Sequence, residues 1–204
     1  MKRIIVTCLI GITTLTTTAL ILPVLPQDSY AQISNSQVEK LEQLIKTAQQ
    51  QIGQYKYQES IKTLQEALAI AIKIKDRKYE AMANLGIGYV YSDIGQPQQA
   101  LEFYEKALPM WQEVGDRSQE ATTLNNISAV YSDIGQRKKA LEYYEKALLI
   151  SEEVGDRSQE ATTLNNIGGV YSQIGQPQKA LEYYEKALPI SQEVGDRSQE
   201  ATTL

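Results

Sequence analysis

Apolar residues recur at steps of three and four along much of this chain, most regularly in the stretch 121–160. This spacing gives a helix one apolar face. The stretch contains two such runs, followed by Gly135 and Gly155, and glycine often follows a helix end because it adopts left-handed conformations without strain. Asp156 then precedes the next run, with Gln159 three residues later in capping-box spacing. The pattern predicts antiparallel helix pairs with short connections. The expected core positions are Ala121, Leu124, Ile127, Val130, Tyr131, Ile134, Ala140, Leu141, Tyr144, Ala147, Leu148, Ile150 and Val154.

The same unit of 40 residues occurs three times in near-copy. Residues 161–200 match residues 121–160 at 33 of 40 positions, and residues 81–120 match 161–200 at 29 of 40. A fixed period of this length is typical of stacked units that cannot bury their apolar faces alone. We therefore expect an all-α solenoid of antiparallel helix pairs, in which the repeats build a surface for binding.

Further segments flank the three copies. Residues 38–80 form a degenerate copy, interpreted as an N-terminal capping repeat, in which Gln51 replaces the tyrosine of the other copies. Its Gly53 is displaced, which predicts a longer loop. Residues 32–37 are expected to be a short disordered lead-in. Residues 201–204 begin another unit, which we interpret as truncated.

Small, aromatic and apolar residues at fixed offsets in all three copies resemble the signature of the tetratricopeptide repeat. The long period resembles the subclass found in kinesin light chains and Pins-type adaptors. It is also similar to secreted bacterial arrays such as the N-terminal parts of CHAT-domain proteins. The resemblance implies a right-handed superhelical solenoid whose concave groove receives peptides. In residues 161–200 the signature positions are Ile167, Gly168, Tyr171, Gly175, Ala180, Tyr184 and Ala187.

A second, mostly polar face of each first helix lies opposite the apolar stripe. The resemblance implies that this face lines the groove, and that Asn126 and Asn166 match the family's groove asparagine. Amide side chains both donate and accept hydrogen bonds, which suits them to a peptide backbone. The alternative is an ordinary solvated helix face. The predicted groove residues of the second and third copies are Thr122, Asn125, Asn126, Ser132, Asp133, Thr162, Asn165, Asn166, Ser172 and Gln173.

The first copy differs on this face, where its residues are more apolar. Met82 and Tyr89 either form a pocket for an apolar ligand side chain or pack on the capping repeat. Ser92 and Asp93 complete the predicted groove set of this copy. We expect no Lys or Arg on this face of any first helix, which argues against an acidic C-terminus as the ligand.

Proline and tryptophan mark departures from the regular pattern. Pro97 and Pro177 stand where a second helix begins, a position that tolerates proline. Pro109 and Pro189 fall inside the second helices, where proline costs about 3 kcal/mol, so a local kink is expected. Trp111 stands where the other copies have serine, and we expect it to be partly exposed.

Composition excludes several classes of function. The chain has 204 residues, no histidine, one cysteine and a net charge of −5, with no basic run. The absence of histidine removes the usual acid–base and metal chemistry, and nothing in the charge pattern points to nucleic acid. We therefore predict no catalytic residues, no metal site and no cofactor.

The N-terminal segment has the layout of a secretory signal. Lys2 and Arg3 precede an uncharged stretch, residues 4–22, and Ser29 and Ala31 offer small residues for cleavage. We expect residues 1–31 to be removed and the protein to be secreted or periplasmic. The alternative is a membrane anchor formed by residues 4–22, since their number approaches a spanning length.

Three functions are compatible with these features. The first is a non-catalytic scaffold that binds a peptide or protein segment in the concave groove. The second is a regulatory arm of a larger enzyme. The resemblance to CHAT-domain proteins implies that this enzyme is a CHAT-type protease. The third is end-to-end self-association through the open C-terminal repeat, where part of the 180–188 face is expected to be exposed.

Overall fold

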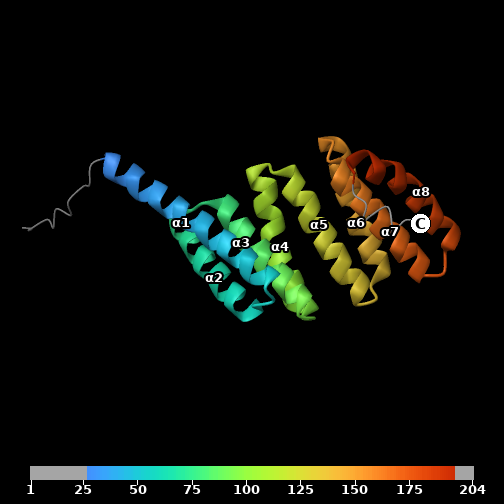
Figure 1. Ribbon diagram of the computed structural model, residues 1–204, viewed down its shortest axis with the longest axis horizontal. Coiled ribbons are helices and arrows are strands. Elements are labelled where there is room, and N and C mark those ends of the chain that lie inside the picture. The colour runs from blue at the N-terminus through green and yellow to red at the C-terminus, as the bar shows by residue number, and fades with distance from the viewer. Residues whose placement is uncertain (1–26, 196–204) are drawn as a thin grey trace, which may run out of the picture.

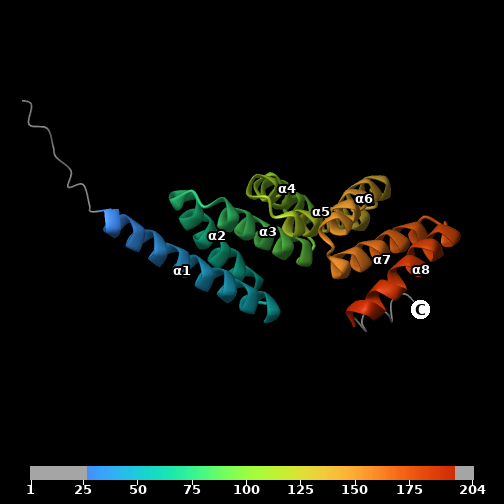
Figure 2. The ribbon, with the colours of Figure 1, turned by 90° about the horizontal axis from the view of Figure 1, so that it is seen from above.

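The computed structural model describes the backbone of residues 27–195 and the side chains of residues 35–195. Within this range the chain folds into eight helices and no strand (Figure 1). The helices are α1 (Gln27–Gly53), α2 (Tyr57–Ile74), α3 (Arg77–Asp93), α4 (Pro97–Val114), α5 (Arg117–Asp133), α6 (Arg137–Val154), α7 (Arg157–Gln173) and α8 (Pro177–Val194). Consecutive helices pair and the pairs stack in chain order, with α1 and α8 at opposite ends of an arched array (Figure 2). The predicted all-α solenoid is confirmed.

Successive pairs share their apolar cores. Ala100 and Tyr104 of α4 form one cluster with Ile127 and Val130 of α5, in the next pair. The same cluster recurs 40 residues later between α6 and α7. Half-buried Tyr131 contacts both clusters, so each pair is packed against the pair before and the pair after. This sharing buries an apolar face that a single pair leaves exposed.

The junction between pairs is built from one short segment. Gly115 has a φ of 76°, and Asp116 caps α5 by accepting the Gln119 backbone N–H at 3.1 Å, as the sequence predicts for this motif. Arg117 then pairs with Glu120 one turn on and with Glu153 at the end of α6, at 2.7 Å. Its counterparts one repeat before and one repeat after make the same two contacts.

The N-terminal pair differs from prediction in two respects. Residues 32–37 belong to α1 and are not a separate disordered lead-in, because they contain no helix breaker and continue the helix. The loop at 54–56 has three residues, as does the loop at 94–96, so it is not longer. Tyr55, at φ 59°, takes the left-handed position that glycine holds in the other copies, and Gly53 ends the helix before it.

The irregular residues of α4 are also placed by the structure. Pro97 begins α4 as predicted, and the helix continues without interruption through Pro109. Trp111 is only 1% exposed and packs against Ala81 and Ala107, so the prediction of partial exposure is wrong. The half-buried side chains of Met82, Leu85 and Met110 pack against the same cluster and help to cover the ring.

Two predictions fall outside the described residues. The signal segment lies there up to residue 26, and so does the start of another unit at 201–204. Cleavage, secretion and membrane anchoring therefore stay predictions. Among the helices that the structure describes, none combines the length and apolar content needed to cross a bilayer.

Candidate binding groove

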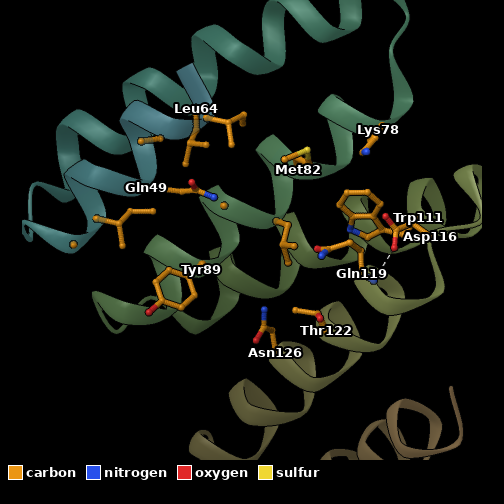
Figure 3. A pocket seen from close by; sticks show the side chains of 16 residues that line it. Gln49, Leu64, Lys78, Met82, Tyr89, Trp111, Asp116, Gln119, Thr122 and Asn126 are labelled. Atoms are coloured by element: carbon orange, nitrogen blue, oxygen red, sulfur yellow. Dashed lines mark hydrogen bonds between the residues drawn. The ribbon is translucent and has the colours of Figure 1, made fainter. Parts of the chain in front are cut away.

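A hollow of about 720 Å³ lies between the N-terminal pair and the first helices of the next two pairs. We call it the N-terminal groove. In Figure 3, Gln49 and Leu64 lie on one side of it, Thr122 and Asn126 lie on another, and Met82 projects between them. The residues that line it are Ile45, Ala48, Gln49, Ile52, Gly53, Leu64, Lys78, Met82, Leu85, Gly86, Tyr89, Trp111, Asp116, Gln119, Thr122 and Asn126.

Departures of α3 from the repeat pattern create this hollow. Gly86 stands where the later copies have Asn126 and Asn166. A Cβ atom at Gly86 would lie 3.0 Å from a methyl carbon of Leu64, so the missing side chain lets α2 approach α3 closely. Tyr89, which replaces alanine or glycine of the later copies, is 47% exposed and forms part of the groove wall.

Amide side chains supply most of the polar groups of the groove. Those of Gln49, Gln119 and Asn126 make no hydrogen bond among the described residues, so they are available to a ligand. Thr122 is already engaged: its hydroxyl donates to the Ser118 carbonyl at 3.0 Å and lies 3.4 Å from an acceptor on Gln159. The groove therefore combines apolar walls with free groups that both donate and accept.

Lys78 places a positive charge at the groove, which corrects the expectation of no Lys or Arg on this face. The residues considered for this face began at position 81, the start of the repeat unit, whereas α3 starts at Arg77. Lys78 makes no ion pair within residues 35–195. Asp116, the carboxylate of the lining, is occupied as the cap of α5.

The structure brings four of the predicted groove residues together. Met82, Tyr89, Thr122 and Asn126 all line the N-terminal groove, although they come from two different copies. Met82 also packs beside the core of the N-terminal pair, which is the second alternative offered for this residue.

The structure corrects the prediction that Asn125 and Asn165 lie open on the groove face. Asn125 is 6% exposed, and its amide donates to the Thr163 hydroxyl at 2.8 Å across the contact between α5 and α7. Asn165, at 9%, is likewise buried. Helical periodicity puts residue 125 near the polar face, but α7 covers it, so Asn125 belongs to the packing of the array and not to an open groove.

The remaining predicted residues do not line the N-terminal groove. A hydrogen bond to Asp93, with smaller effects of desolvation and nearby charge, raises the pKa of Tyr57 to about 12, so Asp93 is engaged with α2. The half-buried members of the set are Ser92, Ser132, Thr162 and Asn166, and the exposed members are Asp133, Ser172 and Gln173. Asn166 occupies on α7 the place that Asn126 occupies on α5, one repeat further along the array.

Several groove residues were not anticipated as such. Gln49 and Leu64 come from the N-terminal pair, whose position against α3 cannot be read from the repeat pattern. Lys78 and Trp111 could have been singled out from the sequence, because each replaces a serine found in both later copies. Within the described residues, no group of acidic or cysteine side chains could hold a metal ion.

A family model described as "Tetratricopeptide repeat" matches residues 53–113 and 119–193, more than half of the chain. No curated protein matches the chain.

Solved structures share the fold at low sequence identity. BtubC (BKLC) from P. vanneervenii superimposes with a TM-score of 0.69 at 18% identity, over 87% of this chain and 83% of that chain. A putative kinesin light chain with nearly identical TPR-like repeats from Podosopora anserina gives 0.65 at 18% identity, over 80% and 81% of the two chains. A Rap protein complexed with Competence and Sporulation Factor gives 0.76 at 22% identity, over 81% of this chain and 46% of that chain. These likenesses show the fold.

Proposed function

Because the chain belongs to the tetratricopeptide repeat family, we propose that it is a non-catalytic scaffold that binds a peptide or protein segment on its concave face. The observation that carries this proposal is the N-terminal groove, where unbonded amide groups of Gln49, Gln119 and Asn126 surround apolar walls. A groove of this kind offers hydrogen bonds to a peptide backbone and burial to its side chains. One neighbour of the same fold, a Rap protein, is seen in a complex with Competence and Sporulation Factor.

The test is a peptide-binding screen with matched variants. Peptides that bind the full chain are compared on two variants. Asn126→Ala/Asn166→Ala removes one amide of the N-terminal groove and its counterpart on α7, and Glu142→Ala/Glu182→Ala changes exposed residues on second helices. The proposal expects the first variant alone to lose affinity, by roughly 10-fold, since each lost hydrogen bond contributes about 1 kcal/mol. Equal affinity for both variants removes the asparagines from the mechanism.

A second candidate function is end-to-end self-association. Leu181 of α8 is 56% exposed, whereas its counterparts Leu101 and Leu141 are half-buried against the following pair. Light scattering over a range of concentrations tests this function, and a monomer at all concentrations excludes it. A regulatory role in a larger enzyme stays a prediction, which the gene sequence beyond the codon for Leu204 tests.

A further inference from the structure

We propose that a group of tyrosines at the edge of the N-terminal pair binds a quaternary ammonium ion, such as the trimethylammonium group of choline. The group consists of Tyr55 in the α1–α2 loop, Tyr57 at the start of α2, and Tyr89 and Asp93 on α3. We call these four residues the tyrosine cluster. This site goes beyond the scaffold function proposed above, since it shares only Tyr89 with the lining of the N-terminal groove.

Tyr55 exposes its ring although its backbone conformation disfavours any side chain. Its φ is 59°, and Gly95, Gly135 and Gly175 take the same left-handed position in the later pairs. The side chain of Tyr55 is 78% exposed, so burial in the core does not account for a tyrosine at this place. Backbone strain of this kind is concentrated at functional positions of proteins.

The aromatic rings and the carboxylate of the cluster lie close together. The ring centroids of Tyr55 and Tyr57 are 6.1 Å apart and their planes are at 79°, and rings at nearly right angles can turn two π faces toward one space. The hydroxyl of Tyr57 donates to Asp93. This hydrogen bond, followed by desolvation and by the charges of Asp93, Tyr55 and Tyr89, raises the pKa of Tyr57 to about 12. Tyr89, which is 47% exposed, adds a third ring beside Tyr57.

Other aromatic rings of the array already have a cation over them. Three stacked pairs connect first and second helices, and lysine Nζ atoms lie between 4.6 and 5.2 Å from the centroids of five of their six rings. Among the side chains of residues 35–195, no lysine or arginine is found over a ring of the tyrosine cluster, and exposed Asp93 makes no ion pair. A cationic ligand would supply the missing partner.

The chemistry of the cluster favours a quaternary ammonium over a primary one. A primary ammonium is strongly hydrated and brings three N–H donors, whereas the cluster offers one carboxylate, which already accepts the Tyr57 hydroxyl. A quaternary ammonium has no N–H to satisfy, and proteins bind such ions through the faces of several aromatic rings. Asp93 adds a charge of opposite sign. The expected ligand is therefore a choline-type cation, either free or as a phosphocholine headgroup.

The experiment titrates the full chain with choline and with tetramethylammonium and follows the N-methyl signals by proton NMR. We expect saturable binding with a Kd of about 1 mM and an upfield shift of these signals, because aromatic rings shield protons above their faces. Ethanolamine, which carries a primary ammonium in place of the trimethylammonium, is expected to bind at least about 10-fold more weakly. Phosphatidylcholine vesicles distinguish a lipid headgroup from a free ion, and binding to either supports the site.

Matched variants place residues of the later copies at the cluster. We expect Tyr55→Gly and Tyr89→Ala each to weaken choline binding at least about 3-fold, and Asp93→Gln to weaken it about 3- to 10-fold. All three new residues occur at the corresponding positions of later copies, and circular dichroism checks the fold. Tyr55→Phe keeps the ring and should keep the affinity. Asp133→Gln, the same change one repeat later, is the control and should bind choline as the wild type does.

Several results would overturn this assignment. Equal affinity for choline and ethanolamine would show charge attraction without a role for the rings. Unchanged affinity in both Tyr55→Gly and Tyr89→Ala, or the same loss in Asp133→Gln as in Asp93→Gln, would place the bound ion elsewhere. The absence of saturable binding to the wild type would exclude the site. The peptide screen on the wild type is a separate measurement, so either proposal can fail while the other stands.

Discussion

Trp111 shows how a single substitution changes one repeat. Its counterparts Ser151 and Ser191 are fully buried small residues, whereas the indole ring fills the space between Ala81 and Ala107 and reaches the N-terminal groove. The ring is buried at 1% exposure, and its Nε1–H has no acceptor among the described residues. Its contribution to stability is therefore packing and not hydrogen bonding.

Replacement of Trp111 tests this role. We expect Trp111→Ser to lower the free energy of unfolding by about 3–5 kcal/mol, because the lost ring leaves a cavity. Trp111→Phe keeps most of the ring volume and removes an unbonded N–H, so its cost is expected to be about 1–2 kcal/mol. Urea unfolding followed by circular dichroism gives both values. Equal losses in the two variants would contradict a packing role.

Asn125 and Asn126 are adjacent residues with different roles, which allows a matched pair of substitutions. Asn125→Ala leaves buried Thr163 without its amide partner and should cost about 1–3 kcal/mol. Asn126→Ala removes a half-buried side chain with no bond among the described residues, so a change within about 0.5 kcal/mol is expected. Chemical denaturation measures both. A larger loss of stability for Asn126→Ala than for Asn125→Ala would contradict the structural role assigned to Asn125.

These residues show where prediction from the sequence ends. The helices, their glycine ends and the Asp116 cap could be predicted, because each depends on neighbours within a few residues. The distinction between Asn125 and Asn126 could not, since it depends on α7, a helix of the next pair. Lys78 was missed because it lies before position 81, where the repeat unit and its predicted groove face begin. The side of the groove formed by α1 and α2 therefore comes from contacts that repeat periodicity does not contain.

Helix ends distinguish the N-terminal pair from the later ones. Gly115, Gly155 and Gly195 have positive φ after the second helices, but α2 ends at Lys75, which adopts the same conformation at φ 59°. A side chain in this left-handed conformation costs about 1–2 kcal/mol relative to glycine's free access to it. The N-terminal pair therefore carries backbone strain that the other pairs avoid.

Removing this strain should stabilise the protein. We expect Lys75→Gly to raise the free energy of unfolding by about 1 kcal/mol, which is the relief of strain less the entropy that glycine loses on folding. Lys73→Gly, two residues earlier and inside α2, is the control and should lower stability by about 1 kcal/mol. Thermal unfolding of the two variants gives opposite shifts. A fall in melting temperature for Lys75→Gly would contradict the assignment.

At the scale of the whole molecule the array is nearly one-dimensional. Each described helix contacts its neighbours in the chain and, between first helices, the one in the next pair. Stability in such an array is a sum of unit and interface contributions, so local damage need not spread to the far end. The N-terminal groove lies at the interface of three pairs and depends on only part of the array.

A substitution near the C-terminal end tests this locality. Ile167→Ala opens a cavity between α6 and α7 and should cost about 2–5 kcal/mol, whereas Ile174→Ala, at 37% exposure, is the mild control. Hydrogen exchange should accelerate in α7 and α8 while α1 and α2 keep their protection. Equal acceleration in all the helices would show that the chain unfolds as one unit.

The arginine–glutamate ion pairs at the junctions between helix pairs have a consequence for how such a chain can lengthen. Arg117 finds both of its carboxylates, Glu120 and Glu153, inside a single period. An in-frame gene duplication of one period therefore brings its own complete set of charge partners. It leaves no charged residue of the neighbouring units without its ion-pair partner. Tandem copying can extend the concave surface one step at a time without a compensating mutation elsewhere.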